Sequence, residues 1–348
     1  MEDPSRPTLV DVARAAGVSR ATVDRVVNGR PNVRPGTVAR VRAAMAKLSY
    51  RPDPLAAGLA RRARRRFCFI LPSGRNAFMA DLAGEIGAMS DWLDRNRAVI
   101  DCRKVDVFDP VALAAAIDAV ERSASGAAIV ALDHPLVRAA IDRLVADGVE
   151  VVTLVSDAPT SRRAQFVGID NSAAGRTAGL LVGRFLGGRA GSVGILVGSL
   201  ALRDHMERCF GFSQLIGRDH PHLTILPIVE TRDDDALAEA AASQMIAERA
   251  DLVALYNAGA GNAGVAAALA AAASEARLVF VGHELTPASR AELLGGRFDA
   301  VIAQNAGHEV RSAARRLLAS AAGEALIDEQ ERIRIDIFVR ENLPESAG

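Results

Sequence analysis

Residues 8–50 read TLVDVARAAGVSRATVDRVVNGRPNVRPGTVARVRAAMAKLSY, and this stretch decides the fold of the first part of the chain. Thr8 followed by Asp11 has the pattern of a capping box, which predicts a helix from there to about Ala16. Gly17 supplies a tight turn, and Ser19 can cap a second helix over 20–27. A third helix is expected over 35–48. Two short helices joined by a glycine turn indicate a helix-turn-helix, whose second helix can enter the major groove of DNA.

Apolar residues at helical spacing supply a small core for these three helices. The residues expected inside are Val10, Ala13, Val18, Val23, Val26, Val38, Val41, Met45 and Leu48. Helical spacing alone also fits a generic helical hairpin.

The charge of the chain is divided unevenly. Residues 1–66 carry 15 Lys and Arg against five Asp and Glu, whereas the other residues carry 27 against 37. A short basic module on an acidic body predicts a polyanionic partner for the first module only.

Composition argues for a cytoplasmic, globular protein. The 348 residues contain no apolar run long enough to span a bilayer and no secretory signal at the N-terminus. Cys68, Cys102 and Cys209 are isolated and lack metal-ligand spacing. We therefore expect buried thiols in a reduced compartment, no metal and no cofactor.

From Phe67 onward, short apolar strands alternate with Ala-rich helical segments. The strands are expected at 67–71, 99–103, 127–132, 151–155, 193–197, 224–229, 252–256, 278–282 and 300–303. This rhythm predicts doubly wound parallel sheets with ligands at the carboxyl ends of the strands. The number of strands predicts two lobes, with a crossing at 167–171 and a return to the first lobe after Gly296.

The motif in residues 8–60 resembles, along nearly its whole length, the headpiece of the LacI/GalR family of transcription regulators. The resemblance implies that Arg20 and Ala21 open the recognition helix after Ser19 and face base edges. Thr22, Arg25 and Asn28 match family positions that contact DNA. Chemically, Arg20 can read guanine and Ala21 can contact a thymine methyl group. Asp24 departs from the family pattern and can pair with Arg20 one turn earlier.

Residues 51–66 resemble the family's hinge and add a basic linker. Asp53 can cap a short helix that begins with Pro54, while Gly58 weakens it. Leu59 matches the hinge leucine that wedges between base pairs in the minor groove, and ordinary dimer packing is an alternative role for it.

The resemblance continues through the body, which looks like a type I periplasmic sugar-binding protein of the ribose-binding kind. The implied effector-binding residues are Asn76, Phe78, Arg208, Asn257, Glu284 and Gln304. The family's Asp-Arg pair after the fourth strand is Val155-Ser156 here, so Asp157 is expected to substitute, and Asp133 after the third strand can also face the cleft. Carboxylates, amides and Arg together match the hydroxyl groups of a sugar.

Two other functions also fit parts of the sequence. Residues 259–264, GAGNAG, match a dinucleotide-binding fingerprint with Glu284 further along the chain, which suggests an NAD-dependent dehydrogenase. A sugar-binding transport protein would explain the body but not the basic headpiece.

The expected protein is therefore a non-enzymatic regulator with three parts. They are an all-α helix-turn-helix headpiece (1–50), a hinge and basic linker (51–66), and a two-lobed α/β effector domain (67–348). Lobe 1 is expected at 67–168 plus 297–325, and lobe 2 at 171–296 plus the C-terminus. The expected partners are double-stranded operator DNA with an inverted repeat, a monosaccharide or polyol effector, and a second copy in a homodimer, without a membrane.

Overall fold

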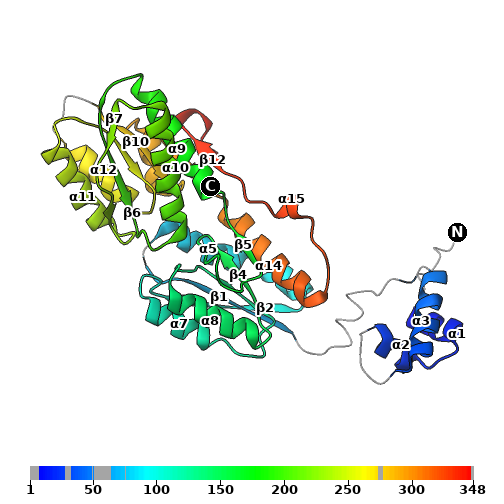
Figure 1. Cartoon of the computed structure of the whole chain (residues 1–348). Coiled ribbons are helices and arrows are strands. Elements are labelled where there is room, and N and C mark those ends of the chain that lie inside the picture. The colour runs from blue at the N-terminus through cyan, green and yellow to red at the C-terminus, as the bar shows by residue number, and fades with distance from the viewer. Residues whose placement is uncertain are drawn as a thin grey trace. The chain divides into compact units, whose positions relative to one another are not determined.

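The computed structural model describes residues 8–27, 33–48, 50, 64–74, 76–272 and 277–345. The chain divides into two compact units, Met1–Ala63 and Arg64–Gly348 (Figure 1). The boundary falls inside the predicted hinge and linker. Within that segment residues 51–63, including Leu59, lie outside the described ranges, as does Asn28 in the first unit.

The first unit contains the three predicted helices, α1 (Leu9–Ala16), α2 (Arg20–Val27) and α3 (Pro35–Lys47). The capping box is present, because the Thr8 backbone N–H donates to Asp11 Oδ2 at 2.9 Å and the Asp11 N–H donates to Thr8 Oγ1 at 3.4 Å. Gly17 ends α1 in the left-handed region at φ 62°, which a glycine adopts without strain. The helix-turn-helix is thus built from the local signals in the sequence.

The core of this unit differs from the expected one at Val10. Val12, Val23 and Val41 are fully buried, whereas Val10 is 47% exposed. Val10 lies two residues from Val12, about 200° around the helix, so the two side chains point to opposite sides. The prediction of a buried Val10 was wrong, and Val12 takes its place.

The second unit begins with a five-stranded parallel sheet in the first lobe. In spatial order its strands are β2 (Ala98–Val105), β1 (Arg65–Pro72), β3 (Gly126–Ile129), β4 (Glu150–Leu154) and β5 (Gln165–Val167). Four of them were predicted. The three-residue β5 was not, because it is too short to show a repeating pattern.

Helices cover both faces of this sheet (Figure 1). The covering helices are α5 (Ala77–Ala88), α6 (Ser90–Arg95), α7 (Pro110–Asp118), α8 (Pro135–Ala146) and α14 (Ala306–Ala322). Along β1, Cys68 and Ile70 belong to the core on the α7 and α8 side, whereas Phe67, Phe69 and Leu71 belong to the core with α5 and α14. Alternation with a period of two therefore buries both faces of the strand.

The second lobe holds a seven-stranded sheet that is parallel except for its last strand. Along the sheet lie β12 (Asp336–Phe338), β11 (Ala300–Ala303), β10 (Val279–His283), β9 (Leu252–Asn257), β6 (Gly191–Val197) and β7 (Leu223–Ile225), with β8 (Val229–Glu230) also paired to β6. The predicted strand at 224–229 is split into β7 and β8 around Pro227, which has no N–H to donate. The antiparallel β12 was not predicted.

The helices of the second lobe also lie on both faces of its sheet. They are α9 (Asn171–Leu186) and α10 (Arg203–Asp219) on one face, and α11 (Asp235–Glu248), α12 (Asn262–Ala271) and α13 (Pro287–Leu294) on the other. The short elements α15 (Asp328–Glu331) and η1 (Arg340–Asn342) flank β12 near the C-terminus.

The chain crosses between the lobes from β5 to α9 and again after β11. The expected return after Gly296 was wrong, because β11 pairs with β10 in the second sheet. The chain returns to the first lobe only with α14, so residues 297–303 belong to lobe 2. A later passage brings β12 back onto β11.

Helices α9 and α10 pack with their backbones nearly touching. A Cβ atom added at Gly175 would lie 2.0 Å from the Arg208 carbonyl oxygen, and one at Gly211 would lie 2.1 Å from the Ser172 carbonyl oxygen. Only glycine allows this approach, because real Cβ contacts do not reach such distances. The contact fixes α10, and with it Arg208, against the first turn of α9.

Gly211→Ala should destabilise the protein by about 1–3 kcal/mol, because a methyl group must push α10 away from α9. Gly217→Ala is a matched control on the same helix, since nothing lies within 4 Å of a Cβ there. It should raise the free energy of unfolding by up to about 1 kcal/mol through helix propensity. Urea unfolding followed by circular dichroism measures both, and equal effects of the two substitutions would contradict the packing argument.

Candidate functional site

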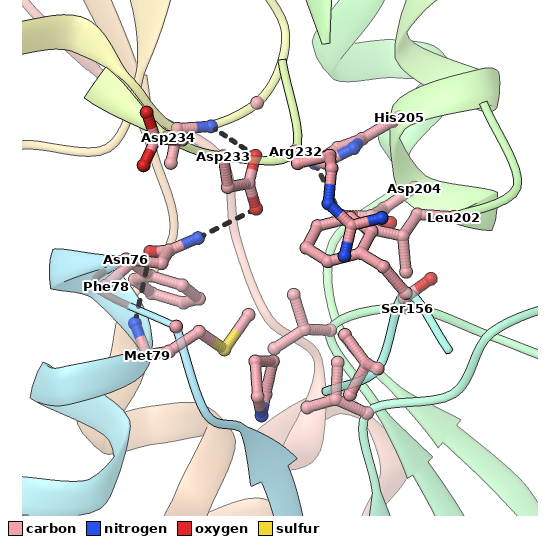
Figure 2. A pocket seen from close by; sticks show the side chains of 18 of the residues that line it. Asn76, Phe78, Met79, Ser156, Leu202, Asp204, His205, Arg232, Asp233 and Asp234 are labelled. Carbon is pink, nitrogen blue, oxygen red and sulfur yellow. Dashed lines mark hydrogen bonds and ion pairs between the residues drawn. The ribbon is translucent and has the colours of Figure 1, made fainter. Parts of the chain in front are cut away.

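A cavity of about 490 Å³ lies between the two lobes, at the carboxyl ends of their strands (Figure 2). Segments that follow β1, β2, β3 and β4 line it from the first lobe, and segments that follow β6, β8, β9, β10 and β11 line it from the second. This is the position in which open parallel sheets bind ligands.

Five of the predicted effector-binding residues line this cavity. They are Asn76, Phe78, Arg208, Glu284 and Gln304. Asn76 is the N-cap of α5, because its Oδ1 accepts from the Met79 N–H at 3.3 Å. Asn76 Nδ2 donates to Asp233 Oδ2 at 3.1 Å, so this side chain also joins the two lobes (Figure 2).

Arg208 lies on α10 and is 2% exposed. Its Nε donates to Asn171 Oδ1 at 2.9 Å and its Nη1 donates to the Ala258 carbonyl oxygen at 3.0 Å. Its buried Nη2 finds no acceptor in the described part of the chain. Two neutral groups therefore orient the guanidinium and leave its Nη2 amino group to donate to a ligand.

Glu284 follows β10 in a left-handed conformation, at φ 67°, and is partly buried. Its Oε1 accepts from Gln304 Nε2 at 2.9 Å. Burial raises the pKa of Glu284 to about 7, although Arg208 opposes the shift. Gln304 itself is buried, and its Oε1 has no donor within the described residues.

Three predicted effector-binding residues, Asp133, Asp157 and Asn257, do not belong to the described lining of the cavity. Arg138 Nε donates to Asp133 Oδ1 at 2.6 Å, and Arg163 Nε donates to Asp157 Oδ1 at 2.6 Å. Each carboxylate thus pairs with an arginine of its own lobe, and Asp133 Oδ2 also lies 4.0 Å from Arg203 Nη1 of the second lobe.

The Asn257 amide serves the loop that follows its strand. Asn257 Nδ2 donates to the Ala260 carbonyl oxygen at 3.0 Å and to Asn262 Oδ1 at 2.8 Å. These bonds use its donors to shape the loop that carries Gly259 and Ala260 to the cavity, and a direct contact between Asn257 and the effector stays a prediction.

Six polar residues that were not predicted from the sequence line the cavity from the start of α10 and from the loop after β8. They are Asp204, His205, Arg232, Asp233, Asp234 and Asp235. Asp204 is 4% exposed, and its Oδ1 has no partner among the described residues. The spacing of Asp204 and Arg208, one helical turn apart, was the available signal.

Polar contacts join the lobes at the rim of the cavity. Arg232 Nη2 donates to Asp106 Oδ2 at 3.1 Å, and the Arg232 guanidinium lies 5.0 Å from the centre of the Phe108 ring. The Arg203 N–H donates to Ser156 Oγ at 3.1 Å. Together with the bond between Asn76 and Asp233, these contacts close the two lobes over the cavity.

The glycines of the GAGNAG segment serve packing. Gly261 has φ 98°, and a Cβ at Gly264 would lie 1.8 Å from the Asp235 carbonyl oxygen, where α12 crosses α11. A Cβ at Gly259 would lie 2.6 Å from the Gly198 nitrogen. The acidic side chains of Asp233 and Glu284 nearby disfavour a pyrophosphate.

On the headpiece, the predicted DNA-contacting residues gather at α2. Ser19, Arg20, Ala21 and Arg25 are exposed and Thr22 is partly exposed. Ser19, Thr22, Arg25 and Arg34 also line a shallow hollow between α2 and the start of α3. Arg34 was not singled out from the sequence, because it lies outside the recognition helix.

These features define a two-lobed binding protein with a helix-turn-helix module ahead of it. Residues 67–325 match the family model described as periplasmic binding protein domain, and residues 8–53 match the model of bacterial regulatory proteins, lacI family. The chain belongs to the periplasmic-binding-protein-domain family and carries a lacI-family regulatory N-terminus. The lacI family, which the N-terminus matches, is a family of transcription regulators without enzymatic activity, so the prediction of a non-enzyme is confirmed and the dehydrogenase alternative is wrong.

Similar curated proteins share the N-terminal part. Catabolite control protein A of Priestia megaterium is 49% identical over 76 residues, and that of Staphylococcus xylosus is 46% identical over the same length. Each alignment covers 22% of this chain and 23% of the relative, so it reports on the headpiece region alone.

Similar solved structures share the fold of the second unit. A glucose-galactose binding protein from Geobacillus stearothermophilus is 22% identical, with a TM-score of 0.72, and the match covers 81% of this chain and 100% of that one. A solute binding protein of an ABC transporter from Burkholderia graminis C4D1M, in complex with D-arabinose, is 20% identical, with a TM-score of 0.74 and coverage of 82% and 99%. The predicted fold class is confirmed.

A buried glutamate beside the cavity gives a pH prediction. Glu309 on α14 is fully buried and neither carboxyl oxygen has a partner within the described residues. Burial, and then the charge of Glu284, hold the pKa of Glu309 well above its usual value. The folded state therefore keeps a proton that the unfolded state releases above its ordinary pKa of about 4.3. The free energy of unfolding should fall as pH rises above that value.

Glu309→Gln should remove this pH-dependent loss of stability. Relative to the wild type, the free energy of unfolding of the variant should rise by up to about 1.4 kcal/mol per pH unit between pH 5 and 8. Chemical denaturation at several pH values measures the difference. Glu331→Gln is the control, because Glu331 is also buried, at 5% exposed, but accepts from Arg315 Nη2 at 2.9 Å. The control should lose stability throughout, and parallel pH profiles for wild type and Glu309→Gln would refute the assignment.

Proposed function

We propose that this protein is a DNA-binding transcription repressor that responds to a monosaccharide or polyol effector bound in the cavity between its lobes. In this proposal a homodimer in the cytoplasm binds an inverted-repeat operator, and no membrane takes part. The structure adds one fact on the last point, that no helix in the described ranges is long and apolar enough to cross a bilayer.

The observation that carries the effector proposal is the set of unpartnered polar atoms on the cavity wall. Asp204 Oδ1 and Gln304 Oε1 are acceptors, and Arg208 Nη2 is a donor. A hydroxyl group donates and accepts at the same atom, so a molecule rich in hydroxyls satisfies both kinds of site. The buried Phe78 supplies an apolar face for the C–H side of such a ligand. The similar solved structures, a glucose-galactose binding protein and a solute binding protein in complex with D-arabinose, support the same class of ligand.

The DNA proposal rests on the lacI-family match and on the charge and exposure of the headpiece. Arg20 and Arg25 extend from α2 into solvent, where they can reach bases or phosphates. Paired half-sites provide the specificity that one headpiece lacks, which favours a dimer. The roles of Asn28 and Leu59 remain predictions from the family resemblance.

Coupling between the two sites follows from linkage. An effector that favours one arrangement of the lobes also favours one arrangement of the DNA-binding modules attached to them. Linkage is reciprocal, so DNA binding changes the affinity for effector by the same factor. Because the second unit begins at Arg64, directly after the predicted hinge, a change in the lobes is transmitted through residues 51–63.

Arg208→Gln should weaken effector affinity by about tenfold to a hundredfold, since a hydrogen bond from a charged group contributes about 1.5–3 kcal/mol. The effector is found by a thermal-shift screen of pentoses, hexoses and polyols, and affinity is then measured by calorimetry and by operator binding. Arg218→Gln is the control on the same helix, because Arg218 is absent from the described cavity lining and its exposed guanidinium pairs with the neighbouring Asp219. Operator binding that ignores every ligand found in the screen would overturn the proposed function.

Arg20→Ala should cost about 1–3 kcal/mol on the cognate operator and relax the preference at one base pair in each half-site. Its exposed place at the first position of α2 motivates the expectation. Fluorescence anisotropy with cognate and random duplexes measures the change. An equal loss on both duplexes would make Arg20 a phosphate contact instead of a base reader.

A further inference from the structure

The deepest wall of the cavity carries more negative than positive groups. Asp204 and Arg208 lie one turn apart on α10, and they form no ion pair with each other among the described contacts. Arg208 is held by the neutral groups of Asn171 and Ala258. Asp204 Oδ2 lies 3.6 Å from His205 Nε2, and its Oδ1 is unpartnered.

Two further carboxyl groups face the same space and receive only neutral donors in the described structure. Asp233 accepts from the Asn76 amide at 3.1 Å and from the Ala260 N–H at 2.9 Å. Glu284 accepts from the Gln304 amide. The other guanidinium on the lining, that of Arg232, is exposed and is paired with Asp106 at the rim.

We propose that the effector is a sugar or polyol that carries a protonated amine, and that the Asp204 carboxylate binds this amine. The inference rests on the proposed function and narrows its ligand class. It follows from two observations. Three carboxyl groups on the cavity wall face one buried guanidinium. Three buried polar atoms on the same wall have no partner among the described residues, namely Asp204 Oδ1, Arg208 Nη2 and Gln304 Oε1.

The chemistry of an ammonium group suits these positions. It offers three donors and no acceptor, and Asp204 Oδ1 and Gln304 Oε1 are both unpartnered acceptors. A buried carboxylate is stabilised far more by a cation than by a hydroxyl group, because charge in a desolvated site is costly unless it is compensated. The hydroxyl groups of the same ligand remain available to accept from Arg208 Nη2.

The same charge excess disfavours anionic effectors. A phosphorylated sugar or a sugar acid would bring a further negative charge beside the carboxylates of Asp204 and Asp233, with one buried guanidinium to compensate it. Like charges within a few ångströms repel strongly in a site with little water.

The test uses the full chain and pairs of ligands that share one scaffold. The pairs are glucose and glucosamine, galactose and galactosamine, mannose and mannosamine, and sorbitol and 1-amino-1-deoxysorbitol, with the N-acetylated form of each amino sugar as a neutral analogue. Calorimetry gives each affinity. For the scaffold that fits, the amine should bind at least about tenfold more tightly than its hydroxyl parent and than the N-acetyl form.

Asp204→Asn should abolish this preference and leave the affinity for the hydroxyl parent within about threefold, because an amide oxygen still accepts a hydrogen bond. Asp235→Asn is the matched control, since it removes an exposed carboxylate from the mouth of the same cavity and should keep the preference. The comparison of ligands on the wild-type protein does not depend on how well either variant folds.

The outcomes separate the two proposals. Tighter binding of the hydroxyl parents, or an amine preference that survives Asp204→Asn, overturns the amine inference and leaves the sugar-responsive regulator intact. Failure of these parents and amines to bind, together with failure of every pentose, hexose and polyol in the thermal-shift screen, overturns both the effector class and the inference drawn from it.

Discussion

The contact of α9 with α10 through two glycines is the constraint on which the site depends. Without a side chain at Gly175 and Gly211, the two helices approach until backbone meets backbone. That approach brings Asn171, at the first turn of α9, within 2.9 Å of the Arg208 Nε on α10. A guanidinium held by a neighbouring helix cannot rotate to find another acceptor, so its remaining donor is fixed in direction before any ligand arrives. This is preorganisation in the ordinary sense, because the ordering entropy is lost on folding and not on binding.

The two sides of the cavity perform different tasks. The first lobe supplies the aromatic ring of Phe78 and small polar groups, whereas the second lobe supplies the buried charged groups on α10 and after β10. The contacts that join the lobes lie at the rim, where Arg232 is exposed and is screened by solvent. Exposed ion pairs contribute little to stability, typically below about 1 kcal/mol. This ion pair therefore opposes only weakly a ligand that contacts both walls and shifts the arrangement of the lobes.

The sequence predicted features whose causes are local. The capping box at Thr8, the turn at Gly17 and most of the strands depend on residues a few positions apart, and they were predicted correctly. Site residues placed directly after strands, such as Glu284 and Gln304, follow from topology. Asp133 and Asp157 pair with Arg138 and Arg163 outside the described cavity lining, and a sequence does not show which partner a carboxylate takes, so their contact with effector stays a prediction. Asp204 was missed because it lies inside a helix, away from the strand ends that were searched.

The return of α14 to the first lobe has a consequence for synthesis. This helix packs Val310, Ala313 and Leu317 into the core that also contains Phe67, Phe69 and Leu71 at the beginning of the second unit. The ribosome makes the chain from the N-terminus, so β1 emerges long before the helix that covers it. The first lobe cannot complete its core until α14 has been made, whereas the helices that the structure describes in the headpiece end by Lys47. A nascent chain therefore has a complete N-terminal module well before it has a domain able to sense anything, and premature termination leaves that module attached to an unfinished, apolar lobe.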